Sequence, residues 1–268
     1  MPASEVVVLP ETARPSKYRI KLQPDLTTFT FSGEQSVDLQ ILEPTTSIVL
    51  NAIDLDISVA TLHANGVTLS NPEITIDKES ETATLVFNDT IQPGDGRLEM
   101  VFSGELNDKL MGFYRSEYTA QDGETRYLAT TQFEPTDARR AFPCWDEPAK
   151  KATFEVTLVF ADEYEAISNT PAVDEAVPGP GLKSVRFAET PVMSTYLLAF
   201  VVGNLVSIDQ RAEGGTKVGV WTTPGKENQA TFALDTSVKL LGYFNAVSYT
   251  HLRAHETDSY LVCRLLLE

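Results

Sequence analysis

The sequence has 268 residues, of which 42% are hydrophobic, and it carries a formal net charge of −17 at pH 7. A chain of this length and apolar content can build one large core or two smaller ones. The negative charge argues against binding to nucleic acid or to an anionic membrane surface, because both require basic patches.

The first residues and the cysteines bear on the compartment. Residues 1–14 are polar and bounded by prolines, and we expect a loose arm there. They contain no basic leader followed by an apolar core, and no later apolar run is long enough to span a membrane. Cys144 and Cys263 are too few for a disulfide framework. The sequence therefore predicts a cytoplasmic protein without a membrane segment.

From residue 17 to residue 103, short segments alternate apolar and polar residues and are separated by turn residues such as Asn65-Gly66. This spacing is typical of the strands of a β-sandwich, and no long helix is needed before residue 130. The expected strands are residues 18–22, 29–33, 37–41, 47–50, 57–62, 73–76, 83–87 and 97–103.

Strands are also expected after residue 150. They cover residues 152–160, 184–188 and 195–203, and the last is apolar on both faces and so predicted to be central. Residues 177–181 contain two prolines and two glycines and are predicted to be a loop. One more strand at residues 217–223 precedes a helix at residues 227–244. In that helix Phe232, Val238 and Leu241 repeat at helical spacing, with Leu234 and Leu240 at neighbouring positions.

Residues 127–156 hold the densest group of charges in the chain. The ionisable side chains are Glu134, Asp137, Arg139, Arg140, Asp146, Glu147 and the Lys150-Lys151 pair, set among Phe133, Phe142, Trp145 and several prolines. Burying charges beside large aromatic residues is unfavourable unless each charge finds a partner. The segment is therefore either a buried ion-pair network or the wall of a site.

Residues 132–148, QFEPTDARRAFPCWDEP, resemble the hallmark run of the N-terminal domain of the M1 (gluzincin) zinc aminopeptidases, in particular the puromycin-sensitive cytosolic branch. Residues 111–116, MGFYRS, and residues 190–203, TPVMSTYLLAFVVG, agree with this family in the same order. The resemblance covers about residues 10–245. It implies a mainly β fold, with a large, saddle-like antiparallel β domain over residues 15–205. It also implies that the first strand and helix of a truncated α/β, thermolysin-like catalytic domain occupy residues 206–245.

The resemblance also implies roles for individual residues. Glu134 takes the position of the glutamate that binds the N-terminal amine of a peptide substrate across the domain boundary, and Gln132 lines the first substrate side-chain pocket. A carboxylate in a partly desolvated pocket attracts an ammonium group more strongly than one in water. The proline after Glu134 favours an extended backbone that projects this side chain outward. The residues read as the frame of the site, pairing their charges to hold the loop, are Asp137, Arg139, Arg140, Asp146 and Glu147. The open alternative is that Glu134 merely pairs with Arg139 or Arg140.

The family resemblance further implies a zinc enzyme that removes single residues from the N-terminus of peptides. A zinc site that hydrolyses peptides needs about three protein ligands. Residues 1–245 contain one histidine, His63, and one cysteine, Cys144, which we expect to be ordinary structural residues. The metal ligands and catalytic motifs are therefore expected in sequence beyond this chain, and the chain alone is expected to be inactive.

The C-terminal residues contain two histidines, His251 and His255, spaced four apart. A zincin helix places glutamate directly after the first histidine, where this chain has Leu252, so we reject a metal site here. Residues 247–257 and 261–268 instead resemble translated sequencing adapter. We therefore expect residues 246–268 to be a non-native tail.

Two other functions remain open from sequence. One is a non-catalytic β-sandwich that binds a partner. The other is a hydrolase that uses Asp137 or Glu147 in a carboxylate pair, which requires two carboxylates facing one cleft at about 5 to 9.5 Å. The oligomeric state is not indicated.

Overall fold

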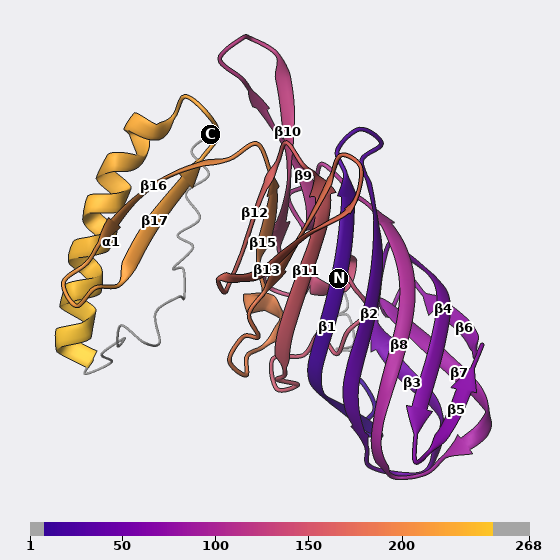
Figure 1. Ribbon diagram of the computed structural model, residues 1–268. Coiled ribbons are helices and arrows are strands. Elements are labelled where there is room, and N and C mark those ends of the chain that lie inside the picture. The colour runs from indigo at the N-terminus through magenta and orange to yellow at the C-terminus, as the bar shows by residue number, and fades with distance from the viewer. Residues whose placement is uncertain (1–7, 249–268) are drawn as a thin grey trace, which may run out of the picture.

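The computed structural model describes residues 8–248 and consists mainly of β-strands, as the sequence predicts (Figure 1). These residues form four β-sheets and end in one α-helix. In spatial order, the largest sheet contains β13 (Ala172–Gly179), β14 (Leu182–Phe187), β11 (Thr153–Ala161), β1 (Ala13–Asp25), β2 (Thr30–Ile41), β8 (Gly94–Glu105), β4 (Leu55–Ala64) and β5 (Val67–Ser70). Side chains in its long strands alternate between buried and exposed, so one face covers a core.

The pairing inside this sheet is antiparallel except between β1 and β11, which run parallel from Lys17 opposite Thr153. β2 is one continuous strand, although the sequence predicts two strands over its length. It pairs with β1 on one side and with β8 on the other. The long, doubly paired β2 and the parallel β1–β11 pair join the first and the last part of this domain.

Two smaller sheets complete the main core. The three-stranded sheet contains β3 (Thr45–Asn51), β7 (Thr82–Ile91) and β6 (Glu73–Asp77); the four-stranded sheet contains β12 (Glu165–Ser168), β15 (Phe200–Gly203), β10 (Thr125–Gln132) and β9 (Gly112–Thr119). β15 is an interior strand, as its apolar sequence predicts, but the first part of the expected strand is the short 3₁₀ helix η2 (Thr195–Leu197).

A series of aromatic contacts links the largest sheet to the four-stranded sheet and to the charged segment. The ring of Phe31 lies 5.1 Å from that of Phe113, and Phe113 lies 5.1 Å from Phe200. Phe200 then contacts Phe133 at 5.9 Å, and Phe133 contacts Phe142 at 6.0 Å. Each such pair adds about 0.5–1.5 kcal/mol beyond the burial of its area. The charged segment is thereby anchored in the core through Phe133 and Phe142.

Two expectations about irregular segments are wrong. The arm expected over residues 1–14 is not loose in its described part, because Leu9 and Ala13 are buried and β1 begins at Ala13. The loop expected at residues 177–181 belongs largely to β13, which lies at the edge of the largest sheet and shifts register between Ala176 and Gly179. An edge strand accepts Pro178 because one row of its backbone groups needs no partner in the sheet.

The last described residues form a unit to one side of the sheets, at the left of Figure 1. A hairpin of β16 (Val206–Arg211) and β17 (Lys217–Thr222) packs against α1 (Glu227–Ser248). It has its own hydrophobic cluster, made of Ala212, Val218, Val220, Ala230, Leu234 and Leu241. Two strands precede the helix in this unit, whereas the sequence predicts one. The domain boundary near residue 206 stays a prediction.

The buried face of α1 differs from the expected one. Leu234 and Leu241 are buried, but Phe232 is 81% exposed and Leu240 is 48% exposed. Phe232 and Leu240 therefore lie on a second apolar face that the hairpin does not cover.

Residues 249–268 lie outside the described part, so the expectation of a non-native tail is not tested there. Within residues 8–248, α1 lacks the long apolar stretch that a membrane-spanning helix requires.

Candidate functional site

The charged segment begins with a tight turn directly after β10. The backbone N–H of Asp137 donates to the carbonyl of Phe133 at 2.8 Å and closes this turn. Phe133 is 2% exposed, whereas Glu134, Pro135 and Thr136 are exposed. The peptide bond between Glu134 and Pro135 is cis. The turn, defined here as residues 133–137, therefore has a buried first residue and presents Glu134 outward.

The 3₁₀ helix η1 (Ala138–Arg140) follows the turn and carries two arginines. Arg139 donates from Nε to Asp146 at 3.0 Å and from Nη1 to Glu81 at 2.9 Å. Its side chain is only 12% exposed. Planar guanidinium groups bind carboxylates with several directional hydrogen bonds, which suits a mostly buried position.

Arg140 is held by carboxylates from three parts of the chain. Its Nε donates to Asp137 at 2.8 Å, and its Nη1 donates to Asp54 at 2.5 Å. Its Nη2 lies 3.6 Å from Glu81. The alternative that Glu134 pairs with Arg139 or Arg140 is therefore wrong, because other carboxylates occupy both arginines.

Asp146 is the most buried charge of the segment, with a side chain 1% exposed. Besides Arg139, its carboxylate accepts a hydrogen bond from the hydroxyl of Thr195 at 2.6 Å. Its backbone N–H donates to the side chain of Asn51 at 3.0 Å. A buried carboxylate is stable only when its charge is paired and its remaining lone pairs are satisfied, and both conditions are met here.

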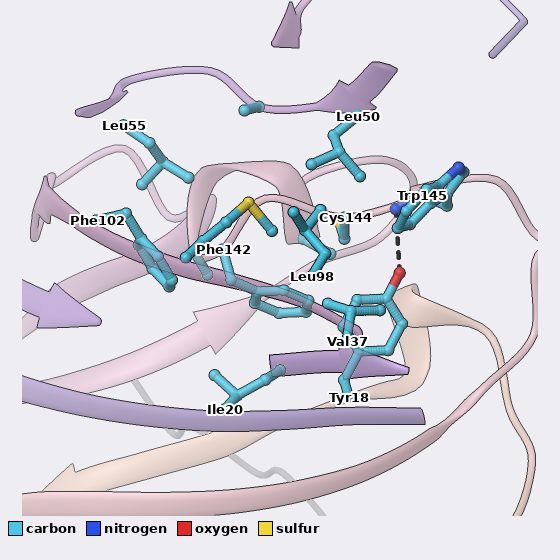
Figure 2. Packing of buried hydrophobic residues seen from close by; sticks show 14 of the residues in the cluster. Tyr18, Ile20, Val37, Leu50, Leu55, Leu98, Phe102, Phe142, Cys144 and Trp145 are labelled. Atoms are coloured by element: carbon cyan, nitrogen blue, oxygen red, sulfur yellow. Dashed lines mark hydrogen bonds between the residues drawn. The ribbon is translucent and has the colours of Figure 1, made fainter. Parts of the chain in front are cut away.

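Residues 142–146 are fixed in the core by polar groups from distant strands. Figure 2 shows Phe142 and Cys144 between Leu50 and Leu55 on one side and Tyr18 and Ile20 on the other. Asn51 and Cys144 exchange two backbone hydrogen bonds, of 2.8 and 3.0 Å. The side chains that complete this anchoring are Gln35, which donates to the carbonyl of Pro143 at 2.7 Å, and Tyr18, which accepts from the backbone of Trp145 at 3.2 Å.

Within the described residues, Glu147 does not form the pair with a positive charge that the sequence predicts for a residue of the frame. Its carboxylate accepts the backbone N–H of Leu9 at 2.6 Å, and no ion pair of Glu147 is found over residues 8–248. The two lysines that follow also have partners, since Lys150 binds Glu11 and Lys151 donates to Ser194 at 2.7 Å. Glu147 therefore ties the start of the described chain to the segment and does not balance an arginine.

Glu134 stands apart from this network. In the part of the chain that the structure describes, its carboxylate has no hydrogen bond or ion pair, and only its backbone carbonyl accepts a long 3.5 Å bond from Gln132. Gln132 is half-buried at the end of β10. The partly desolvated pocket expected for Glu134 is not seen here, because the side chain is exposed.

The position of Glu134 relative to the last unit follows from strand direction. β10 and β15 are antiparallel, with Ala129 opposite Val202. Glu134, beyond the end of β10, therefore lies toward the start of β15, whereas the chain leaves β15 for β16 at the other end of the sheet.

A glycine allows η1 to approach β9. Gly112 has φ of +69°, and a Cβ atom built there lies 2.5 Å from the Cβ atom of Arg140. Any other residue both adopts an unfavourable backbone conformation and displaces Arg140. The glycine in the MGFYRS motif thus has a direct physical role beside the arginine pair.

Sequence reasoning missed the distant partners of the segment. Asp54 and Glu81 reach the arginines across 86 and 58 residues of sequence, and Asn51 reaches Asp146 across 95. Asp54 follows β3 closely and Glu81 lies between β6 and β7, both on connections between strands. No local signal marks them as partners of the arginines.

The described residues do not fit a zinc site. Over residues 8–248, no three of the usual ligand side chains come together. His63 lies on β4, with Nδ1 3.0 Å from the hydroxyl of Thr68. Cys144 is fully buried, and this burial, reinforced by the nearby Asp146 charge, raises the pKa of its thiol well above the ordinary value. The carboxylate-pair alternative also loses support, because Asp137 binds Arg140 and Glu147 binds the Leu9 backbone.

Comparison with known proteins gives a consistent result. Residues 14–197 match the family described as the peptidase M1 N-terminal domain. Over 88% of its length, the chain is 47% identical to aminopeptidase M1-D of Oryza sativa subsp. japonica, 41% identical to puromycin-sensitive aminopeptidase of Caenorhabditis elegans and 40% identical to aminopeptidase N of Acetobacter pasteurianus. It spans 27%, 25% and 65% of the length of these relatives, respectively. Because the family match covers more than half of the residues, this chain belongs to the peptidase M1 N-terminal domain family.

Proposed function

We propose that this chain is the N-terminal part of a zinc aminopeptidase that removes N-terminal residues from peptides, and that Glu134 binds the α-ammonium group of the substrate. Gln132 lines the pocket for the first substrate side chain. The observation that carries this proposal is that the Glu134 carboxylate is exposed and unpaired within residues 8–248, although both arginines of η1 are occupied by other acidic residues. The names of the relatives, all aminopeptidases, support the reaction class.

The physical argument concerns charge and rigidity. An aminopeptidase distinguishes the end of a peptide from its middle by the free ammonium group, which only the end carries. A carboxylate that already has an arginine partner has little attraction left for an ammonium group, so an unpaired one is required. Glu134 meets this requirement, and its turn is fixed by the buried Phe133 and by the Asp137–Phe133 hydrogen bond. We assign the desolvation of this pair to the bound peptide and to parts of the full-length protein that this chain does not contain.

The zinc part of the proposal concerns other sequence. Because the described residues offer no group of metal ligands, we assign the zinc ligands and the catalytic groups to parts of the full-length protein that this chain does not contain, and we expect this chain alone to be inactive. We place the activity in the cytoplasm, with free peptides as the partners. The family membership leaves the alternative of a non-catalytic binding module without a specific supporting observation.

The test uses the protein expressed from its complete reading frame. We expect Glu134→Gln to raise KM for an aminoacyl p-nitroanilide roughly 10- to 100-fold, because one charge-assisted hydrogen bond to the substrate is lost. The unfolding temperature is expected to stay unchanged. Glu117→Gln, at an exposed position on β9, is the matched control. As a second readout, the inhibition constants of leucinamide and of its analogue lacking the amine are measured.

The two inhibitors separate amine binding from other effects. We expect the parent protein to prefer leucinamide, and the Glu134→Gln variant to lose that preference. An unchanged KM together with an unchanged preference removes Glu134 from the site. Activity that survives the chelator 1,10-phenanthroline contradicts the zinc assignment.

A further inference from the structure

Glu81 occupies an unusual position between the two arginines of η1. Its Oε2 lies 2.9 Å from Nη1 of Arg139, and its Oε1 lies 3.6 Å from Nη2 of Arg140. Among residues 8–248, no other carboxylate contacts both guanidinium groups. The side chain is 32% exposed, so solvent screens these contacts only partly. The connection between β6 and β7 thus contacts both arginines through this one carboxylate.

The backbone of Glu81 is held in a conformation that its residue type disfavours. Its φ is +55°, in the left-handed region that glycine and asparagine adopt more readily. The carbonyl of Glu81 accepts the backbone N–H of Ala52 at 3.0 Å, which holds the hairpin in place. Strained backbone of this kind persists where the surrounding contacts enforce it, and it is common at functional sites. A glycine fits the backbone better but provides no carboxylate for the arginines.

A short series of contacts connects Glu81 to the turn that holds Glu134. Arg140, which Glu81 contacts, donates from Nε to Asp137 at 2.8 Å. The backbone N–H of Asp137 closes the turn by donating to Phe133 at 2.8 Å. Glu134 lies between the buried Phe133 and the anchored Asp137. A change in the position of Arg140 therefore moves the end of the turn and with it the direction of the Glu134 carboxylate.

We propose that Glu81 is a positioning residue for Glu134: it holds the arginine pair, and through Arg140 and Asp137 it sets the direction in which Glu134 meets the substrate ammonium group. This inference rests on the proposed function of Glu134. Asp54 also accepts a hydrogen bond from Arg140, at 2.5 Å, but its side chain is 64% exposed, so solvent screens this contact more than it screens those of Glu81. Glu81 is the less exposed of these two partners.

The experiment uses the protein expressed from its complete reading frame, with KM and kcat measured for an aminoacyl p-nitroanilide. We expect Glu81→Gln to raise KM about fivefold or more, which corresponds to the coupling energy measured between residues of one ion-pair network. We expect kcat to change less than about twofold. In a Glu134→Gln background we expect Glu81→Gln to give no further rise, because the carboxylate it positions is already removed. Glu79→Gln is the matched control, since Glu79 is exposed on the same hairpin.

A second variant separates positioning from folding. Glu81→Gly relieves the positive φ and still removes the carboxylate, so we expect it to unfold at a temperature close to that of the parent protein and yet to share the raised KM. If Glu134→Gln raises KM but neither Glu81 variant does, the inference about Glu81 is overturned and the proposed function stands. A rise of equal size in the Glu134→Gln background also overturns it, because the effect then does not pass through Glu134. If Glu134→Gln itself leaves KM unchanged, the proposed function fails, and this inference with it.

Discussion

The hydroxyl of Tyr18 accepts a hydrogen bond from the backbone N–H of Trp145 at 3.2 Å, joining β1 to the charged segment across 127 residues of sequence (Figure 2). Tyr18 is completely buried, and its ring stacks on that of Phe154 at 5.0 Å. Burial raises the pKa of Tyr18 well above its ordinary value, so the phenol stays neutral. The first strand thereby holds the backbone just before the buried Asp146.

Replacing this hydroxyl tests how much the anchor contributes. We expect Tyr18→Phe to lower the free energy of unfolding by about 1–3 kcal/mol, because the Trp145 N–H is left buried without an acceptor. Urea denaturation followed by tryptophan fluorescence measures the change. Tyr243→Phe, at a residue 60% exposed, is the control and is expected to change stability little. Equal stabilities of the Tyr18 variant and the parent protein contradict the anchoring role.

The Asp146 carboxylate offers a stronger test of the buried network. We expect Asp146→Ala to lower the free energy of unfolding by about 3–5 kcal/mol, because it removes the more buried of the two carboxylate partners of Arg139 and leaves part of a buried positive charge uncompensated. Asp122→Ala removes the exposed pair with Arg126 and is expected to cost less than about 1 kcal/mol. Chemical denaturation of both variants gives the comparison. A loss at Asp146 as small as that at Asp122 shows that the network contributes little.

Cys144 provides a chemical test of burial. Its thiol is fully buried and its pKa is raised by that burial, so little reactive thiolate forms at neutral pH. In a Cys263→Ser background, we expect Cys144 to react with Ellman's reagent far more slowly in the native protein than in 6 M guanidinium chloride. The release of the coloured thiolate measures both rates. Rapid reaction of the native protein contradicts the packing of Cys144.

The pair between Glu11 and Lys150 predicts a pH dependence of stability. The hydrogen bond and the charge of Lys150, whose side chain is 4% exposed, lower the pKa of Glu11 below its ordinary value of 4.5. Because the folded pKa is the lower one, the pair stabilises the protein above pH 4.5, and this contribution is lost as the pH falls through the folded pKa. We therefore expect Glu11→Gln to be less stable than the parent protein at pH 7 and equally stable at low acidic pH.

Urea denaturation at several pH values measures this difference. Glu43→Gln, at an exposed position, is the control and is expected to show no such dependence. A difference between Glu11→Gln and the parent protein that persists undiminished to low pH contradicts the role of the pair.

Several parts of the fold could be predicted from the sequence because they depend on local patterns. Alternating apolar residues locate most strands of the large sheet, and the helical repeat locates α1. The predictions that are wrong have physical causes. Residues 172–179 form a strand in spite of Pro178 because they lie at a sheet edge, and Phe232 is exposed because the β16–β17 hairpin covers only the other face of α1.

For the candidate site, the sequence alone determined that charges concentrate beside aromatic residues after β10 and that Glu134 precedes a proline there. Only the tertiary structure decided which charges neutralise one another. It assigned Arg139 to Asp146 and Glu81, assigned Arg140 to Asp137 and Asp54, and left Glu134 unpaired within residues 8–248. The reason is that an ion pair depends on distance in space. The β3–β4 connection that carries Asp54 and the β6–β7 hairpin that carries Glu81 reach the arginines only after the sheets have packed around a common core.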